Sequence, residues 1–200
     1  MEERITFKSG QINIEGILNK NTSERGVVLA HPHPLYGGNM FDFVVESSAN
    51  AFWNKGYTTL KFNFRGVGKS QGRFDNGKGE QEDLKAAISY LTDLGMKKID
   101  LAGYSFGTWV ISQLDHKSLG VEHLFYISPP MAMMDFGGNA AMNSIKLVVT
   151  GSLDEYAPPD ILRRNLEKWN SPAKLEVIQG ADHFYGGFHY KLEQIFSVHL

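Results

Sequence analysis

The sequence KIDLAGYSFGTWVISQL, residues 98–114, changes from a strand pattern to a helix pattern at Ser105. A serine on so sharp a turn is forced into a strained backbone conformation, and the residues two before and two after it must be small so that strand and helix can pass closely. Gly103 and Gly107 meet that requirement. We expect the hydroxyl to stand exposed beyond the strand, with the amide of Phe106 pointing to where an oxyanion would form.

Strand patterns lie on both sides of this turn. Residues 4–18 alternate apolar and polar side chains around Ser9 and Gly10, which predicts an antiparallel hairpin at a sheet edge. Short runs rich in apolar and β-branched residues predict six further strands, at 26–31, 58–64, 98–104, 123–128, 145–151 and 174–180.

Four apolar stripes with helical spacing fall between most of these strands, and such stripes are typical of helix faces buried in a core. They consist of Phe41, Val44, Val45, Ala49 and Phe52; Leu84, Ala87, Ile88, Leu91 and Leu94; Leu162, Leu166 and Trp169; and Phe188, Leu192, Ile195 and Phe196. Alternating strands and helices predict the α/β class, with a mostly parallel sheet covered on both faces. Ligands of such sheets bind beyond the carboxyl ends of the strands, so functional residues are sought there.

Composition narrows the class of protein. The chain has 200 residues, of which 42% are hydrophobic and 21% charged, and we expect one domain over residues 1–200. The formal charge of −2 offers no basic surface for nucleic acid or an anionic membrane, so neither is an expected partner. Cysteine is absent, which excludes disulfides and thiolate sites. The start of the sequence lacks a secretory pattern and its apolar runs are short, so we expect a cytoplasmic protein.

Two later strand ends carry the partners that a reactive serine needs. A serine hydroxyl is a weak nucleophile at neutral pH and requires a base, which in turn requires an orienting acid. Asp154 and His183 each come three residues after the glycine that ends a predicted strand, in GSLDEYAPP and GADHFYGG. By itself, Asp154 is typical of a turn or a helix cap, and His183 of a loop. Their joint placement, however, predicts a triad with Ser105.

Other acids and histidines compete for these roles. Asp135 follows the preceding strand, Glu155 adjoins Asp154, and Asp182 adjoins His183. Neighbouring side chains on an extended loop diverge, so Asp182 is expected to anchor its loop. The remaining histidines, read as ordinary surface or core residues, are His116, His123, His189 and His199.

Five motifs together resemble the small, lidless α/β-hydrolases, a bacterial group near the dienelactone hydrolase and serine-aminopeptidase-like branches. They are HPHPLYGGNM, FRGVGKSQG, GYSFG, GSLDE and GADHF, and the resemblance runs from Ile5 to Phe196. It implies the α/β-hydrolase fold with an antiparallel edge, and it matches Ser105, Asp154 and His183 to the family's nucleophile, acid and base. True dienelactone hydrolases use a cysteine nucleophile, which this chain lacks, so their substrate is not implied.

The stretch HPHPLYGG, residues 31–38, is the loop from which such a hydrolase takes a second oxyanion donor. Its two prolines lack an N–H and fix the path of the loop. We favour Leu35, with Phe106 as the first donor. The four amides from which the second donor is chosen belong to His33, Leu35, Tyr36 and Gly37.

Neither a metal nor a nucleotide cofactor is expected. His31 and His33 could share one face of a strand, but no carboxylate or third histidine lies near them in sequence. A phosphate-binding loop ending in Gly68-Lys69-Ser70 would need glycine at position 63, where Asn63 stands. We expect that stretch to border the site, with Arg65 bracing neighbouring loops and Glu80, Glu82 and Asp83 opening the next helix.

The segment 129–143, between two predicted strands, is too short for a cap domain. We therefore expect a shallow, open cleft, partly walled by flexible apolar side chains that could equally pack under a loop; these belong to Met131, Met133, Met134 and Phe136. The predicted activity is that of a serine hydrolase acting on a small carboxylic ester or related acyl compound. A non-catalytic binding module and a peptidase of the same fold are the alternatives, and the sequence indicates no oligomeric state.

Overall fold

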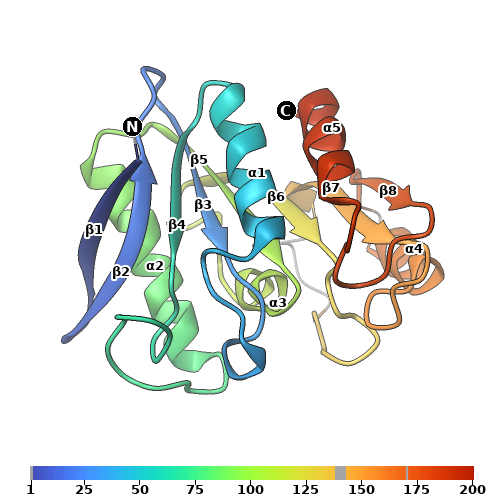
Figure 1. The fold of residues 1–200 in the computed structure, drawn as a ribbon, viewed down its shortest axis with the longest axis horizontal. Coiled ribbons are helices and arrows are strands. Elements are labelled where there is room, and N and C mark those ends of the chain that lie inside the picture. Colours follow the sequence, from blue (N-terminus) through green and yellow to red (C-terminus); the bar gives the residue numbers. More distant parts are fainter. Residues whose placement is uncertain (1, 138–142, 170) are drawn as a thin grey trace.

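Eight strands form one sheet in the computed structural model, which describes residues 2–137, 143–169 and 171–200 (Figure 1). The strands are β1 (Glu2–Ser9), β2 (Ile12–Asn19), β3 (Arg25–Ala30), β4 (Thr58–Phe62), β5 (Lys98–Tyr104), β6 (Val121–Ile127), β7 (Ile145–Gly151) and β8 (Lys174–Ile178). Their order across the sheet is β1-β2-β4-β3-β5-β6-β7-β8. β1 pairs antiparallel with β2, and β2 with β4, while every later pairing is parallel. The mostly parallel sheet with an antiparallel edge hairpin is thus confirmed.

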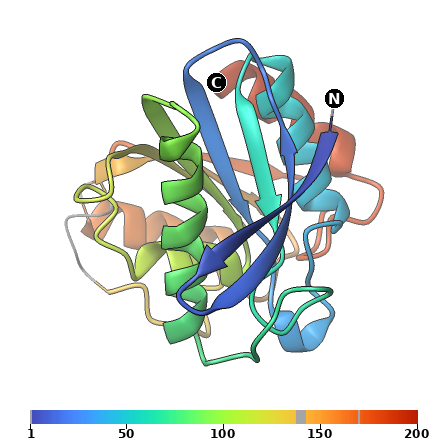
Figure 2. The same cartoon turned by 90° about the vertical axis from the view of Figure 1, so that its left-hand side faces the viewer.

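Helices cover both faces of the sheet, as the alternating pattern predicts (Figure 2). Side chains of α1 (Phe43–Asn54) and α5 (His189–His199) join one buried apolar cluster. Side chains from the opposite face, contributed by α2 (Lys78–Asp93), α3 (Phe106–Ser112) and α4 (Pro159–Lys168), join the other. The strands β4, β5 and β7 are almost wholly buried, so apolar burial on both faces holds this part of the sheet between its helices.

The ends of two helical stripes are wrong in the sequence prediction. Phe41 precedes α1 and is 50% exposed. The Asp42 carboxylate accepts a hydrogen bond from the Val44 amide, so Asp42 caps the helix and Phe43 is its first residue. Leu94 follows the last residue of α2 and is 37% exposed. Both residues have the right spacing but lie outside their helices, Phe41 before the N-cap residue of α1 and Leu94 as the C-cap residue of α2.

The central strand β3 lies between β4 and β5, with all three parallel. The chain leaves β3 towards α1 on one face, and it leaves β5 towards α3 on the other. Connections that diverge in this way leave a crevice beyond the carboxyl ends of the two strands, where ligands of open α/β sheets bind. This topology brings residues 31–38 beside Ser105.

Within the described residues, no helix combines the length and the apolar character needed to cross a membrane. Residues 138–142, which belong to the segment in which we expected no cap, lie outside the described residues.

Candidate active site

Ser105 has the strained backbone that its motif predicts, with φ 52° and ψ −118° between β5 and α3. A Cβ added at Gly103 would lie 2.7 Å from the carbonyl carbon of Gly107. A Cβ added at Gly107 would lie 2.3 Å from the carbonyl oxygen of Ala30, at the end of β3. Any side chain at either glycine would therefore push strand and helix apart. The need for small residues on both sides of the serine is confirmed.

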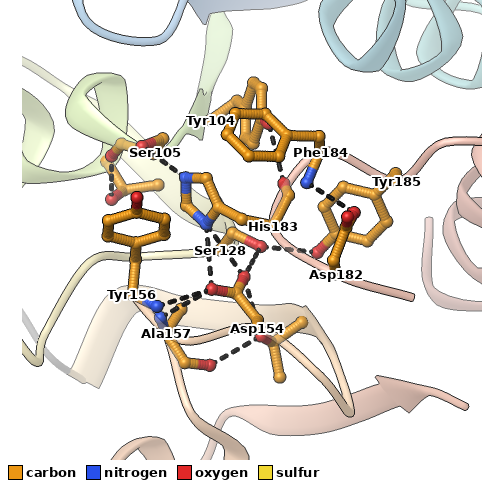
Figure 3. A network of polar contacts seen from close by, with 12 residues as sticks. Tyr104, Ser105, Ser128, Asp154, Tyr156, Ala157, Asp182, His183, Phe184 and Tyr185 are labelled. Carbon is orange, nitrogen blue, oxygen red and sulfur yellow. Dashed lines mark hydrogen bonds and ion pairs between the residues drawn. The ribbon is translucent and has the colours of Figure 1, made fainter. Parts of the chain in front are cut away.

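His183 and Asp154 lie next to Ser105 in one line of hydrogen bonds (Figure 3). The Ser105 Oγ is 2.9 Å from Nε2 of His183. The other ring nitrogen, Nδ1, is 2.9 Å from Oδ1 of Asp154 and 3.0 Å from its Oδ2. The structure thus brings together the three residues that the sequence placed after three different strands.

The loops that carry the acid and the histidine touch each other through their backbones. The Leu153 amide donates to the carbonyl oxygen of Ala181 at 2.9 Å. A Cβ added at Gly151 would lie 2.2 Å from that same oxygen, so the approach depends on glycine at the end of β7. The hydroxyl of Tyr104 fixes the second loop by donating to the His183 carbonyl oxygen at 2.8 Å.

Asp154 is a buried carboxylate, 3% exposed, with many donors around it. Oδ1 accepts from the amides of Tyr156 at 2.9 Å and Ala157 at 2.8 Å. Burial by itself raises the pKa of Asp154, but the hydrogen bond and charge of His183, with the donors of Ser128 and Ala157, outweigh it and leave the pKa below its usual value. Asp154 is therefore ionised at neutral pH, as an orienting acid must be.

Ser128 and Tyr185 belong to the same network, and sequence reasoning missed both. The Ser128 hydroxyl donates to Oδ2 of Asp154 at 2.5 Å and lies 2.8 Å from the Tyr185 hydroxyl. The sequence held one signal for Ser128, because it ends the predicted strand 123–128 at the edge where functional residues were sought. Tyr185 carries no signal beyond its place two residues after His183.

The rival acids make other contacts. Asp182 is exposed and accepts from the Phe184 amide at 3.0 Å, so it anchors its own loop as expected. Asp135 accepts from the Gly137 amide in its own turn. Glu155 points to solvent. Among the described carboxylates, Asp154 is the one hydrogen-bonded to the His183 ring.

The loop after β3 uses most of its amides internally. The Leu35 amide donates to Nδ1 of His33 at 3.2 Å, within the short helix η1 (Pro34–Tyr36). The amides of Tyr36 and Gly37 donate to the carbonyls of His33 and Pro34. The preference for Leu35 as oxyanion donor is therefore corrected, because the His33 ring already holds that amide.

Of the four loop amides considered as the second oxyanion donor, that of His33 remains. It has no hydrogen-bond acceptor among the described residues. The His33 ring packs against the Phe106 ring with centroids 4.8 Å apart, so the loop lies directly beside the start of α3. Phe106 opens that helix, and its amide likewise has no acceptor in the part of the chain that the structure describes.

His31 is a structural residue. It is fully buried, and Nδ1 donates to the Pro32 carbonyl at 2.6 Å while Nε2 accepts from the Phe64 amide at 3.0 Å. Both ring nitrogens are thus used in joining the ends of β3 and β4. Burial lowers the pKa of His31 from 6.5 to about 4, and the Pro32 hydrogen bond offsets only part of this effect.

The free energy of unfolding is expected to fall as the pH drops from 6.5 towards 4. Because the pKa of His31 is lower in the folded state, the unfolded chain takes up this proton first, so the contribution is complete above pH 6.5 and is lost on acidification. Between pH 7.5 and 5 the loss is about 2 kcal/mol. Chemical denaturation at both pH values measures it for the wild type and for His31→Gln. The variant is expected to show a drop smaller by about that amount, and equal drops would contradict the assignment.

The side chains expected to wall the cleft mostly face elsewhere. Met131 and Met134 pack against the core, and Phe136 is buried against the ring of Tyr126. All three line a cavity of about 370 Å³ next to Trp169, at the end of α4. Met133 alone of the four expected wall residues is mainly exposed, at 70%. Met131, Met134 and Phe136 therefore pack under a loop, which was the alternative to lining the cleft.

Arg65 braces neighbouring loops as expected, through hydrogen bonds from its Nε and Nη2 to the buried carboxylate of Asp83 on α2. Glu80, also on α2, accepts from the amides of Asp75 and Gly77, which lead into that helix. These contacts fix the loop after β4, and none of them involves Ser105.

Three possible metal ligands lie near the amino ends of β5 and β6, at the opposite end of these strands from Ser105. Asp100, Glu122 and His123 have ligand atoms within 4.8 Å of one another. Asp100 already accepts from the Tyr57 hydroxyl at 3.0 Å and faces the Arg25 guanidinium at 3.6 Å. The Arg25 guanidinium balances the charge of the Asp100 carboxylate, so we interpret the cluster as a structural ion pair.

No family model matches the chain. The chain is 36% identical over 203 residues to the uncharacterized protein RP471 of Rickettsia prowazekii, across 96% of this chain and 84% of that protein. An α/β serine hydrolase homologue from Coxiella burnetii superposes with a TM-score of 0.90 at 32% identity, covering 99% of this chain and 97% of its own. XC6422 from Xanthomonas campestris, an α/β serine hydrolase without a lid, gives a TM-score of 0.90 at 28% identity over 98% and 92% of the two chains.

Proposed function

The chain belongs to the small, lidless bacterial α/β-serine hydrolases, and we propose that it cleaves a small carboxylic ester or related acyl compound through an acyl-enzyme on Ser105. The observation that carries this proposal is the unbroken line of hydrogen bonds from Ser105 Oγ through both nitrogens of His183 to Asp154. A serine held in that way can lose its proton as it attacks.

The mechanism follows from these contacts. Nε2 of His183 accepts the proton of Ser105 while Oγ attacks the acyl carbon, and then returns it to the departing alcohol. Water repeats the sequence on the acyl-enzyme and releases the acid. The Asp154 carboxylate accepts from Nδ1–H, which keeps Nε2 free to act as the base and stabilises the imidazolium as it forms.

Two backbone amides are proposed to stabilise the negative oxygen of the tetrahedral intermediate. Phe106 supplies the first, from the start of α3. We assign the second to His33 in place of Leu35, since the Leu35 amide is hydrogen-bonded within its loop. Removal of one oxyanion donor typically lowers kcat by roughly 10²- to 10³-fold, so we expect these two amides to contribute substantially to the rate.

A comparison of an ester with an amide of the same acyl group tests this function. We expect p-nitrophenyl acetate to be hydrolysed and p-nitroacetanilide to be cleaved far more slowly. Faster cleavage of the anilide would favour the peptidase alternative. Turnover of neither compound would favour a binding module, although such a module has no need of a hydrogen-bonded triad.

Short acyl chains are the expected substrates. The rim near Ser105 is open, with exposed side chains such as Leu35, Tyr36 and Phe184, so a long chain stays partly in water. Each methylene left in water forfeits about 0.8 kcal/mol of transfer free energy. We expect kcat/KM for p-nitrophenyl esters to stay level or fall beyond about four to six acyl carbons.

A chain-length series, measured below the micelle concentrations of the esters, checks this expectation. The competing structure is a small lid formed by the segment around Met133, which is exposed and whose neighbour Ala132 donates its amide to the Tyr156 carbonyl. Such a lid would bury longer chains, and kcat/KM would rise steadily through eight or ten carbons by a few-fold per methylene pair. That rise would reject the open cleft.

A further inference from the structure

Strained backbone is concentrated around the triad. Among the described residues other than glycine, four have positive φ: Asn76, Ser105, Ser128 and Tyr185. Asparagine adopts this region readily, whereas serine and tyrosine do so at a cost that the surrounding structure must offset. Ser105 is the proposed nucleophile, so the other two strained residues call for a reason of their own.

Ser128 and Tyr185 share one hydrogen bond that leads to the acid (Figure 3). Both are fully buried, and their hydroxyls lie 2.8 Å apart. Because the Ser128 hydroxyl gives its proton to Oδ2 of Asp154, its oxygen accepts the proton of Tyr185. The direction of both hydrogen bonds is thereby fixed, and it runs towards the carboxylate.

The two oxygens of Asp154 are held by different parts of the chain. Backbone amides of residues 156 and 157 hold Oδ1. Oδ2 has the Ser128 hydroxyl at 2.5 Å, while the Thr150 hydroxyl lies farther away at 3.4 Å and donates at 2.7 Å to the Ala157 carbonyl. Ser128 is therefore the main donor to Oδ2 after His183, and its loss would leave Oδ2 with the His183 ring and the more distant Thr150 hydroxyl.

Ser128 is also tied to the nucleophile by its backbone. The carbonyl of Ile127, the preceding residue, accepts from the Ser105 amide at 2.9 Å. The Ser128 amide donates to the Val149 carbonyl at 2.8 Å, on the strand that leads to Asp154. Glycine would adopt a φ of 46° without strain, so the serine at this position is explained by its hydroxyl and not by its backbone.

We propose that Ser128, supported by Tyr185, is a positioning residue that sets the orientation and charge of the Asp154 carboxylate during the reaction. This inference rests on the proposed function. Because the Ser128 hydrogen bond helps to lower the pKa of Asp154, its removal is expected to raise that pKa and to leave the carboxylate less firmly held against the His183 ring. The titratable groups that face the Asp154–His183 pair are Asp42, Tyr104, Tyr156 and Tyr185.

The substitution Ser128→Gly separates positioning from structural support, because glycine removes the hydroxyl and relieves the strain together. Loss of a hydrogen bond to a charged group is expected to lower kcat for p-nitrophenyl acetate by roughly ten- to a hundred-fold. Tyr185→Phe keeps the Ser128 donor, so a smaller loss is expected, and Asn76→Gly is the matched control at a positive φ outside the network.

The downfield NMR signal of the His183 Nδ1 proton gives a readout that needs no substrate, because this proton lies in the hydrogen bond to Asp154. We expect the signal to shift in Ser128→Gly and to stay unchanged in Asn76→Gly. An unchanged signal together with an unchanged kcat would overturn the proposal, as would a loss of kcat matched by the fraction of unfolded protein. A shifted signal in a protein that hydrolyses no ester would support the positioning role while refuting the proposed function.

Discussion

Ser105→Ala is expected to lower kcat for p-nitrophenyl acetate by about 10⁴-fold or more, as when the nucleophile of a triad is removed. Among the described residues, Ser105 supplies the hydroxyl at 2.9 Å whose proton His183 Nε2 accepts, so the variant lacks the side chain that attacks the acyl carbon. The fold should survive, because the side chain is partly exposed and alanine replaces it without added bulk.

The measurement is steady-state hydrolysis, with circular dichroism and thermal unfolding as checks of the fold. Ser112→Ala is a matched control on the same helix, where the hydroxyl donates to the Trp109 carbonyl at 2.7 Å and accepts from the Gln113 side chain at 3.0 Å. The control should keep nearly full activity. Retention of even a tenth of the wild-type rate by Ser105→Ala would refute the assignment of the nucleophile.

Asp154→Asn is the second variant with a large expected effect, a fall in kcat of roughly 10⁴-fold. Asparagine keeps the shape of the side chain, but its amide group donates towards Nδ1 and favours the ring tautomer whose proton sits on Nε2. That nitrogen then cannot accept the proton of Ser105. The imidazolium also loses the buried negative charge that stabilises it.

Asp135→Asn is the natural comparison, since Asp135 is a rival acid whose carboxylate accepts a hydrogen bond from the Gly137 amide in its own turn. We expect this variant to keep nearly all of its activity. If Asp135→Asn lowered kcat more than Asp154→Asn did, the acid would be wrongly assigned. Equal, small effects of both would mean that His183 is oriented by its loop alone.

The features that the sequence predicts well are those set by local chemistry or by topology. The turn at Ser105 is marked by glycines within two residues, of which Gly103 makes its close contact within the motif and Gly107 with the end of the neighbouring strand β3. Asp154 and His183 are far from Ser105 in sequence, but the carboxyl ends of parallel strands meet at one edge of the sheet, and this rule was sufficient to bring them together.

The features that were missed depend on contacts that spacing does not encode. The choice of Leu35 failed because the direction of an amide depends on the turn, and here the His33 ring captures it. Met131 and Met134 have no periodicity that distinguishes a cleft wall from a packed loop. Ser128 and Tyr185 meet only after β6 and the loop beyond β8 are folded against β7.

Labelling with a fluorophosphonate, followed by mass-spectrometric mapping of the modified peptide, tests the central claim most directly. Such a probe reacts with a serine only where a base activates it and an oxyanion site holds the phosphonyl oxygen. We expect one adduct per chain, located on Ser105, with much slower labelling of Asp154→Asn. An unmodified chain, or an adduct on any other residue, would contradict it.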